Sequence, residues 1–266
     1  MKTVTFVIAL VSLAAARAQS ADIPALLGVE PDRYFADRDS AYADPYYGLR
    51  YLMYGNKRFA EDKAVGPRQT DADLKSSEAG QKPFAVIIGC ADSRVPNEII
   101  FDQGVGDLFI TRTAGQVMAE ASYGTIEYAT EALQTRLIVV LGHQSCGAVT
   151  AAMKRPENPP GHVVTLINAI TPAALSAAAL TDGHDHSEDE KLEIAVRENV
   201  LQQVNLLRGL EPVLSRRFER GELLIVGAVY DLETGRVNFI DETILSLPRF
   251  RGETGVDTEY VPATPN

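Results

Sequence analysis

Residues 84–94 read FAVIIGCADSR, an apolar run that leads without a break into a cysteine, an aspartate and an arginine. A second stretch, residues 137–147, reads LIVVLGHQSCG and has the same form, ending in a histidine and a cysteine. Continuous apolar, β-branched runs are typical of strands that are buried on both faces of a parallel sheet. The two stretches therefore predict two neighbouring strands with chemically active side chains at their carboxyl ends.

The other apolar patterns alternate between strands and helices. Further strands are expected at 108–111 and 223–230, followed by a turn at 231–235 and a hairpin or edge strand at 236–240. Helices are expected at 46–61, 122–133, 147–154, 163–180 with an interruption at Pro172, and 191–219 with a new start at Pro212. This alternation predicts an α/β fold, with a mostly parallel sheet of four to five strands flanked by helices and an N-terminal helical arm. In such sheets ligands bind beyond the carboxyl ends of the strands.

The chain divides into four segments. Residues 1–18 are predicted to be a signal peptide, because a basic start and an apolar run precede Ala16-Arg17-Ala18, a small-x-small pattern cleaved before Gln19. Residues 19–45 are polar and contain three prolines, so we expect an irregular N-terminal arm. Residues 46–247 are expected to form a single catalytic domain, and residues 248–266 a flexible C-terminal tail.

The net charge and the N-terminal segment limit where the protein can be located and which partners it can bind. A cleaved signal peptide predicts an exported protein, periplasmic if the source is a Gram-negative bacterium, and the alternative is an uncleaved membrane anchor. We expect no other segment to cross a membrane. The net charge of −11 becomes about −13 once Lys2 and Arg17 are removed. A chain this acidic lacks the basic surface that nucleic acids require, so we expect no nucleic-acid partner.

The chain contains only two cysteines, Cys90 and Cys146. In an oxidising compartment two cysteines favour a disulfide, and the sequence leaves this alternative open. A disulfide does not require His143 three residues before Cys146, nor Asp92 two residues after Cys90. Catalytic zinc commonly has three protein ligands and an open fourth position, and Cys90, His143 and Cys146 supply such a set. Thiolates are soft donors whose charge nearly neutralises the ion.

Asp92 and Arg94 determine what fills the fourth position. The Asp92 carboxylate could bind the ion directly and exclude water, or Arg94 could hold it in a bidentate pair that leaves the position to water. A surface ion pair is the plain alternative for these two residues. A further segment, His184-Asp185-His186, is expected to be a solvated loop rather than a metal site, because it lacks apolar packing and a third spaced ligand.

The segments Cys90–Arg94 and Gly142–Gly147 resemble the two signature segments of the β-class carbonic anhydrases. The similarity continues through residues 95–115 and 124–129, covers residues 46–153 well, and extends more loosely over the later helices and the fourth strand. Two joined motifs of this length are far more specific than one short pattern. The resemblance implies a domain of this family, of the exported bacterial type.

For the metal, the resemblance implies one Zn²⁺ per subunit, bound by Cys90, His143 and Cys146. It also implies an Asp92–Arg94 dyad, whose aspartate either coordinates zinc or is held off it. The implied activity is that of a lyase that reversibly hydrates carbon dioxide to bicarbonate and a proton, by attack of zinc-bound hydroxide on carbon dioxide. The alternatives are hydrolysis of carbon disulfide or carbonyl sulfide on the same scaffold, and a non-catalytic zinc or redox protein.

For the substrate, the resemblance implies four further residues. Gln81 hydrogen-bonds substrate across the subunit interface, Phe109 and Tyr128 shield the carbon dioxide site, and the backbone N–H of Gly147 donates to bicarbonate. Members of the family form homodimers or larger assemblies such as homotetramers, which gives the helix at 46–61 a neighbour to wrap around. Some bacterial members bind inhibitory bicarbonate at a separate site that includes a tryptophan. This chain contains no tryptophan, so we do not expect that form of regulation.

Overall fold

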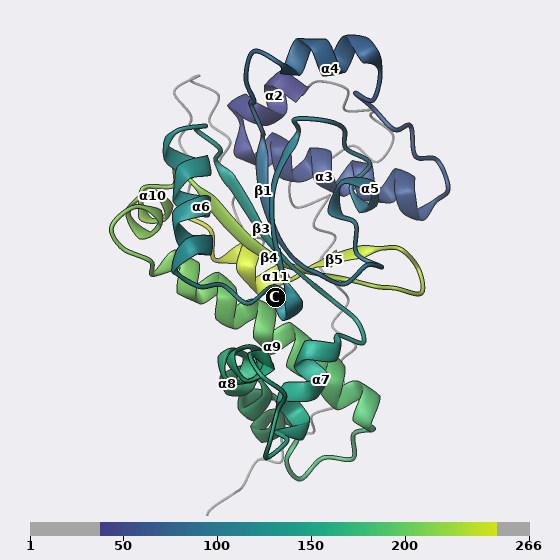
Figure 1. Ribbon diagram of the computed structural model, residues 1–266, viewed down its shortest axis with the longest axis vertical. Helices are drawn as coiled ribbons and strands as arrows, with labels where there is room; N and C mark the ends of the chain where they lie inside the picture. The colour runs from purple at the N-terminus through teal and green to yellow at the C-terminus, as the bar shows by residue number, and fades with distance from the viewer. Residues whose placement is uncertain (1–37, 249–266) are drawn as a thin grey trace, which may run out of the picture.

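The computed structural model describes residues 38–248. The predicted signal peptide, most of the predicted arm and all but the first residue of the predicted tail lie outside the described residues. The described chain forms a five-stranded sheet in the order β2-β1-β3-β4-β5 (Figure 1). Its strands are β1 (Ala85–Cys90), β2 (Leu108–Thr113), β3 (Leu137–His143), β4 (Leu224–Tyr230) and β5 (Val237–Phe239). The first four are parallel and β5 pairs antiparallel with β4, which confirms the predicted fold class.

The two predicted central strands, β1 and β3, lie side by side inside the sheet, and every residue of both is buried. Successive side chains point to opposite faces, so Ile87 packs in one core cluster and Ile88 in another. The register pairs Gly89 of β1 with Leu141 of β3. Cys90 therefore ends its strand beside the carboxyl end of β3.

Helices cover both faces of the sheet (Figure 1). They are α2 (Arg38–Ala43), α3 (Pro45–Ala60), α4 (Asp71–Ser77), α5 (Asn97–Ile100), the 3₁₀ helix η1 (Ala114–Gln116), α6 (Glu120–Glu131), α7 (Gly147–Lys154), α8 (Val163–Thr181), α9 (Glu188–Arg208), α10 (Leu214–Glu219) and α11 (Asp241–Leu245). Residues of α3 pack with Ile87 on one face, and residues of α6 and α9 pack with Ile88 on the other. Helices α7, α8 and α9 form a third apolar cluster, which includes Cys90 and Cys146.

Helix α2 corrects the sequence prediction, which placed this segment in an irregular arm. Its first residue, Arg38, forms an ion pair of 2.8 Å with the buried carboxylate of Asp107, and Ala41 is buried in the core. Helix α3 follows, with the Asp44 side chain as its N-cap and Pro45 at its start, and confirms the helix predicted at 46–61.

Helix α8 is continuous over 19 residues, so the predicted interruption at Pro172 is wrong. Proline removes one backbone hydrogen bond, here to the carbonyl of Asn168, and both residues are exposed, where water can satisfy that carbonyl. By length and composition alone, α8 is also the one described helix apolar enough to cross a membrane, which differs from our expectation. It packs against α7 and α9. Helices α9 and α10 separate around Pro212, as predicted.

Candidate metal centre

Three buried side chains converge at the carboxyl edge of the sheet. Cys90 is the last residue of β1, His143 is the last residue of β3, and Cys146 is the N-cap residue of α7. The two sulfurs and a ring nitrogen of His143 lie within 4.8 Å of one another. A tetrahedral zinc site with Zn–S bonds of about 2.3 Å and Zn–N bonds of about 2.1 Å has ligand separations of roughly 3.5–3.8 Å. Small side-chain movements therefore close the three ligands around one ion.

A tight turn brings His143 and Cys146 together. Ser145 in this turn has φ of +52°, in the left-handed region. The backbone N–H of Gln144 donates to the carbonyl of Tyr230 at 3.0 Å, which anchors the turn on the end of β4. The parallel register of β3 and β4 thus fixes the position of the turn that carries His143 and Cys146.

The imidazole of His143 is oriented for a metal. Its Nδ1 lies 2.8 Å from the carbonyl oxygen of Gln144, an acceptor, so the ring carries its proton on Nδ1. Nε2 then keeps its lone pair, and it is buried without a hydrogen-bond partner among the described residues. Such a buried nitrogen costs free energy unless another group takes its lone pair. Two sulfurs and this nitrogen form a donor set that fits zinc.

Both cysteines are free thiols, so they do not form the alternative disulfide in the structure. A hydrogen bond with the Cys146 side chain, helped by contacts with His143 and with backbone N–H groups, lowers the pKa of the Cys90 thiol well below its ordinary range. The same contact raises the pKa of the Cys146 thiol. The two directions are opposite because the sulfurs compete for one proton. The two cysteines thus readily lose one proton, which leaves one thiolate. They lose the second proton when a cation lies beside them.

Asp92 and Arg94 lie at the open side of this group. Oδ2 of Asp92 is 3.8 Å from Nε2 of His143. Nε and Nη2 of Arg94 donate to the two carboxylate oxygens at 2.9 and 2.8 Å, and the Arg94 backbone N–H donates to Oδ1 at 2.9 Å. The Arg94 guanidinium holds the pKa of the Asp92 carboxyl well below its usual range. Of the two predicted arrangements, the structure contains the one in which arginine holds the aspartate.

Two residues that the sequence did not single out hold the segment of Cys90 and Asp92. Arg112, near the end of β2, donates to the carbonyl of Cys90 at 2.8 Å and to that of Asp92 at 2.6 Å. The backbone N–H of Gly115 donates to the sulfur of Cys90 at 3.2 Å. Both lie in the stretch that resembles the family, but only the register that pairs Cys90 with Thr113 places them beside the site.

The structure does not bring Gln81, Phe109 and Tyr128 to the metal ligands of the same chain. Gln81 is exposed and precedes the amino end of β1. Phe109 lies four residues before Thr113, the residue paired with Cys90, which is about 13 Å at the rise of a strand. The ring of Tyr128 lies 6.2 Å from that of Phe109, between centroids, and Tyr128 is exposed. The three residues therefore lie away from the metal centre, toward the other end of these strands.

Gly147 lies beside the metal centre. It begins α7 directly after Cys146, and it is exposed. Nothing lies within 4 Å of the place that a Cβ of Gly147 would take. Its N–H is one of the first amides of a helix, which have no partner within the helix.

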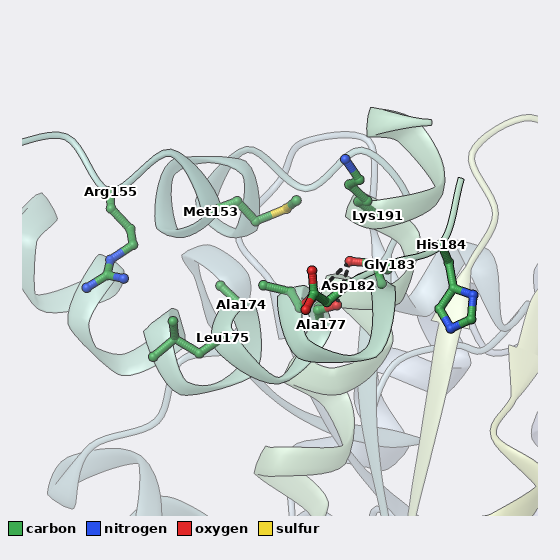
Figure 2. A pocket seen from close by; sticks show the side chains of 11 residues that line it. Met153, Arg155, Ala174, Leu175, Ala177, Asp182, Gly183, His184 and Lys191 are labelled. Atoms are coloured by element: carbon green, nitrogen blue, oxygen red, sulfur yellow. Dashed lines mark hydrogen bonds between the residues drawn. The ribbon is translucent and has the colours of Figure 1, made fainter. Parts of the chain in front are cut away.

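A separate pocket of about 530 Å³ lies between α7, α8 and the start of α9 (Figure 2). Its wall includes Met153, and Lys191 at its edge is already paired with Glu188 at 2.8 Å. No residue that lines it belongs to the metal centre. His184 also lines this pocket, and its ring centroid is 6.1 Å from that of His186. Within the described part of the chain, these two histidines do not form a three-ligand metal group.

Two buried thiols and an imidazole, at the carboxyl edge of a parallel sheet, define a zinc-binding α/β protein. The model of the carbonic anhydrase family matches residues 85–237. Carbonic anhydrase 2 of Mycobacterium tuberculosis is 41% identical over 196 residues, which cover 73% of this chain and 91% of that relative. The carbonic anhydrase of Mycolicibacterium smegmatis is 38% identical over 199 residues, with 73% and 93% covered.

Among solved structures, the β-carbonic anhydrase CcaA superposes with a TM-score of 0.61 at 27% identity. The match covers 75% of this chain and 98% of that one. The chain belongs to the carbonic anhydrase family, in its β class, and its cofactor is zinc.

Proposed function

We propose that this protein catalyses the reversible hydration of carbon dioxide to bicarbonate and a proton. The observation that carries the proposal is the buried group of Cys90, His143 and Cys146. Asp92 lies beside this group and is hydrogen-bonded by Arg94. Three protein ligands leave one position of a tetrahedral ion open, and a catalytic zinc needs that position. The relatives carry the name carbonic anhydrase, in agreement with this site.

When bound here, zinc supplies a Lewis acid that activates water as a nucleophile toward carbon dioxide. Asp92 is charged at neutral pH, and Arg94 lowers its pKa still further; the carboxylate offers Oδ2 as a hydrogen-bond acceptor that orients this water. The guanidinium holds the carboxylate by two parallel hydrogen bonds, so that Asp92 stays out of the fourth ligand position. The Arg94 side chain is about half exposed in the single chain.

The product anion binds beside the zinc ligands. The N–H of Gly147 donates to an oxygen of bicarbonate at the N-terminus of α7, where the helix dipole favours a negative charge. The exposed position of Gly147, with open space around it, supports this role. A side chain at this position would take up the space that the anion needs.

Gln81, Phe109 and Tyr128 serve the site of a neighbouring subunit. They lie away from the metal centre of their own chain, so a second copy in a two-fold arrangement supplies them to it. Gln81 then hydrogen-bonds the substrate, and the two aromatic rings shield the apolar carbon dioxide from water. The exposed apolar side chains of Ile99 and Tyr128 support such an interface, because association removes them from water. We infer that a homodimer is the smallest active unit and that a homotetramer is a pair of such dimers.

The signal-peptide pattern supports an exported enzyme, which begins at Gln19 after cleavage. In an oxidising compartment, Cys90 and Cys146 must bind zinc before they pair with each other. Fractionation of the source cells followed by N-terminal sequencing tests the location. A chain that begins at Gln19 outside the cytoplasm supports export, and a chain that keeps Met1 inside it contradicts export.

Stopped-flow measurement of carbon dioxide hydration tests the activity. Zinc-loaded wild-type protein is expected to be active from about pH 7 to pH 9, and Cys146→Ser, which lacks one ligand, is expected to be inactive. An inactive, zinc-loaded wild type over this range would refute the proposed function.

A further inference from the structure

Helix α9 packs against β3, which carries His143, and against α7, which begins directly after Cys146. Gly142, directly before His143, has no room for a side chain, because a Cβ there would lie 2.6 Å from a methyl carbon of Val200 in α9. Gly115 is closed in the same way, since its Cβ would lie 2.7 Å from the Cδ1 atom of Ile170 in α8. The backbone around the zinc ligands is thus set by the helices that touch it.

Asn199 of α9 connects to the metal centre through Gly115. The side chain is fully buried, and its Nδ2 donates to the carbonyl of Gly115 at 3.0 Å. The N–H of the same glycine donates to the sulfur of Cys90 at 3.2 Å. Two hydrogen bonds therefore link an amide on α9 to a zinc ligand at the end of β1.

The Gly115 turn needs such support. Gly115 has φ of +64° and Gln116 has φ of +46°, so two successive residues occupy the left-handed region. For Gln116 this conformation is sterically unfavourable, because the residue has a Cβ that glycine lacks. Such a conformation persists only where neighbouring groups stabilise it.

Asn199 is a polar residue on the buried face of α9. The buried face of this helix is otherwise mainly apolar around it, with Val196 and Val200 as neighbours. A buried amide is unfavourable unless hydrogen bonds compensate it, and Oδ1 of Asn199 has no partner among the described residues. The hydrogen bond to Gly115 offsets this cost, so donation to that carbonyl is the role that the side chain performs.

We propose that Asn199 is a positioning residue of the zinc centre, which fixes the Gly115 turn so that the Gly115 N–H donates to the ligand sulfur of Cys90. An N–H···S hydrogen bond withdraws electron density from a thiolate and fixes its orientation, so it tunes the Lewis acidity and the affinity of the metal. The inference rests on the proposed zinc site, and it is independent of the substrate.

Asn199→Leu tests this role, because leucine has a similar size and fits the apolar face but cannot donate. In cobalt-substituted protein, the sulfur-to-cobalt charge-transfer band is expected to move to longer wavelength, since a sulfur without the hydrogen bond gives up an electron more easily. Competition with a chelator is expected to show that the variant binds zinc about tenfold more weakly than the wild type. This is the lower end of the range for residues that support a metal ligand indirectly. An unchanged band and an unchanged affinity would overturn the proposal.

Asn56→Leu is the matched control. Asn56 is also buried, and its side chain holds the backbone of Ile100, Gly235 and Val237, none of which belongs to the metal centre. This variant is expected to lose stability while the cobalt band stays in place. A band shift in Asn56→Leu as large as that in Asn199→Leu would assign the effect to general loosening and would also overturn the proposal.

If Asn199→Leu does not fold, the wild-type protein loaded with ¹¹³Cd provides the test. The amide proton of Gly115 is expected to show a scalar coupling to ¹¹³Cd through the sulfur of Cys90. A metal-loaded wild type without this coupling lacks the bond on which the inference stands, and overturns it while leaving the zinc site intact. A wild type that binds neither cadmium nor zinc would instead contradict the proposed function.

Discussion

Asp92 is bound by Arg94 through both of its carboxylate oxygens, at 2.9 and 2.8 Å. The carboxylate so held lies 3.8 Å from Nε2 of His143, close enough to reach the metal if it were released. We infer that the arginine and a bound metal compete for the same carboxylate, and that this competition controls whether water reaches the fourth ligand position.

Arg94→Ala is expected to release Asp92 onto the zinc. Carbon dioxide hydration should fall by on the order of 10²-fold, because the nucleophile loses its place and its acceptor. Zinc content, measured by elemental analysis, should stay at the wild-type value. Arg94→Lys keeps the charge but lacks the planar fork, so its rate should lie between the two. Loss of zinc from Arg94→Ala would contradict this account.

Mixed subunits test the shared site. Cys146→Ser cannot complete its own zinc site, and Gln81→Ala cannot serve its partner, so each variant alone should be nearly inactive. In a hybrid dimer, the chain with intact ligands receives Gln81 from the other chain. Unfolding and refolding an equal mixture should restore about a quarter of the wild-type activity, because half of the dimers are hybrids with one complete site each. No recovery in a mixture shown to contain hybrids would place Gln81 in its own subunit's site.

Gly142→Ala is expected to disturb the zinc centre through packing. The added Cβ would meet Val200 at 2.6 Å, so the strand end beside His143 must shift, at a cost of about 1–3 kcal/mol in the free energy of unfolding. Gly124→Ala, in helix α6 with open space around it, should instead stabilise the protein by about 0.5–1 kcal/mol. Urea unfolding at a fixed protein concentration measures both. Equal effects of the two substitutions would show that the close contact at Gly142 is unimportant.

The start of helix α9 should give stability a specific pH dependence. The backbone N–H and hydroxyl of Ser187 hold the pKa of the Glu190 carboxyl below its ordinary value. Since the folded-state pKa is the lower one, the charged form contributes stability above the unfolded value of about 4.3, and this contribution disappears as pH falls through the folded-state pKa. Glu190→Gln should therefore be less stable than wild type at about pH 7, and the difference should vanish once the pH has fallen below the lowered folded-state pKa of Glu190. A difference that grows as the pH falls would contradict the capping role.

The central part of the fold could be predicted because a strand buried on both faces needs a continuous apolar run, and β1 and β3 have one. Helix α2 could not, since Arg38 is held by Asp107, a contact that no local pattern reveals. The break predicted at Pro172 failed because the proline lies on an exposed side of α8, where the lost hydrogen bond costs little. Local sequence patterns thus predicted the strands that are buried on both faces. They did not predict a helix held by a distant contact, or a proline tolerated because it is exposed to solvent.

Some residues of the metal centre could likewise be predicted from the sequence, and others could not. Cys90, His143 and Cys146 could be grouped from sequence, because parallel strands bring their carboxyl ends to one edge. The Gly115 amide could not be found, since a backbone donor has no signature in the sequence. For Asn199 a signal existed, namely a polar residue within the buried face of an amphipathic helix. The placement of Phe109 and Tyr128 away from the metal ligands needed the strand register as well.

Zinc titration tests most directly whether the Cys-His-Cys centre carries the activity. The protein is stripped with a chelator under reducing conditions, and zinc is returned stepwise while carbon dioxide hydration and thiol reactivity are followed together. We expect the rate to rise linearly to a limit at one zinc per subunit, while the two thiols, Cys90 and Cys146, lose their reactivity in the same proportion. Full activity without zinc, or zinc saturation with both thiols still reactive, would contradict the account.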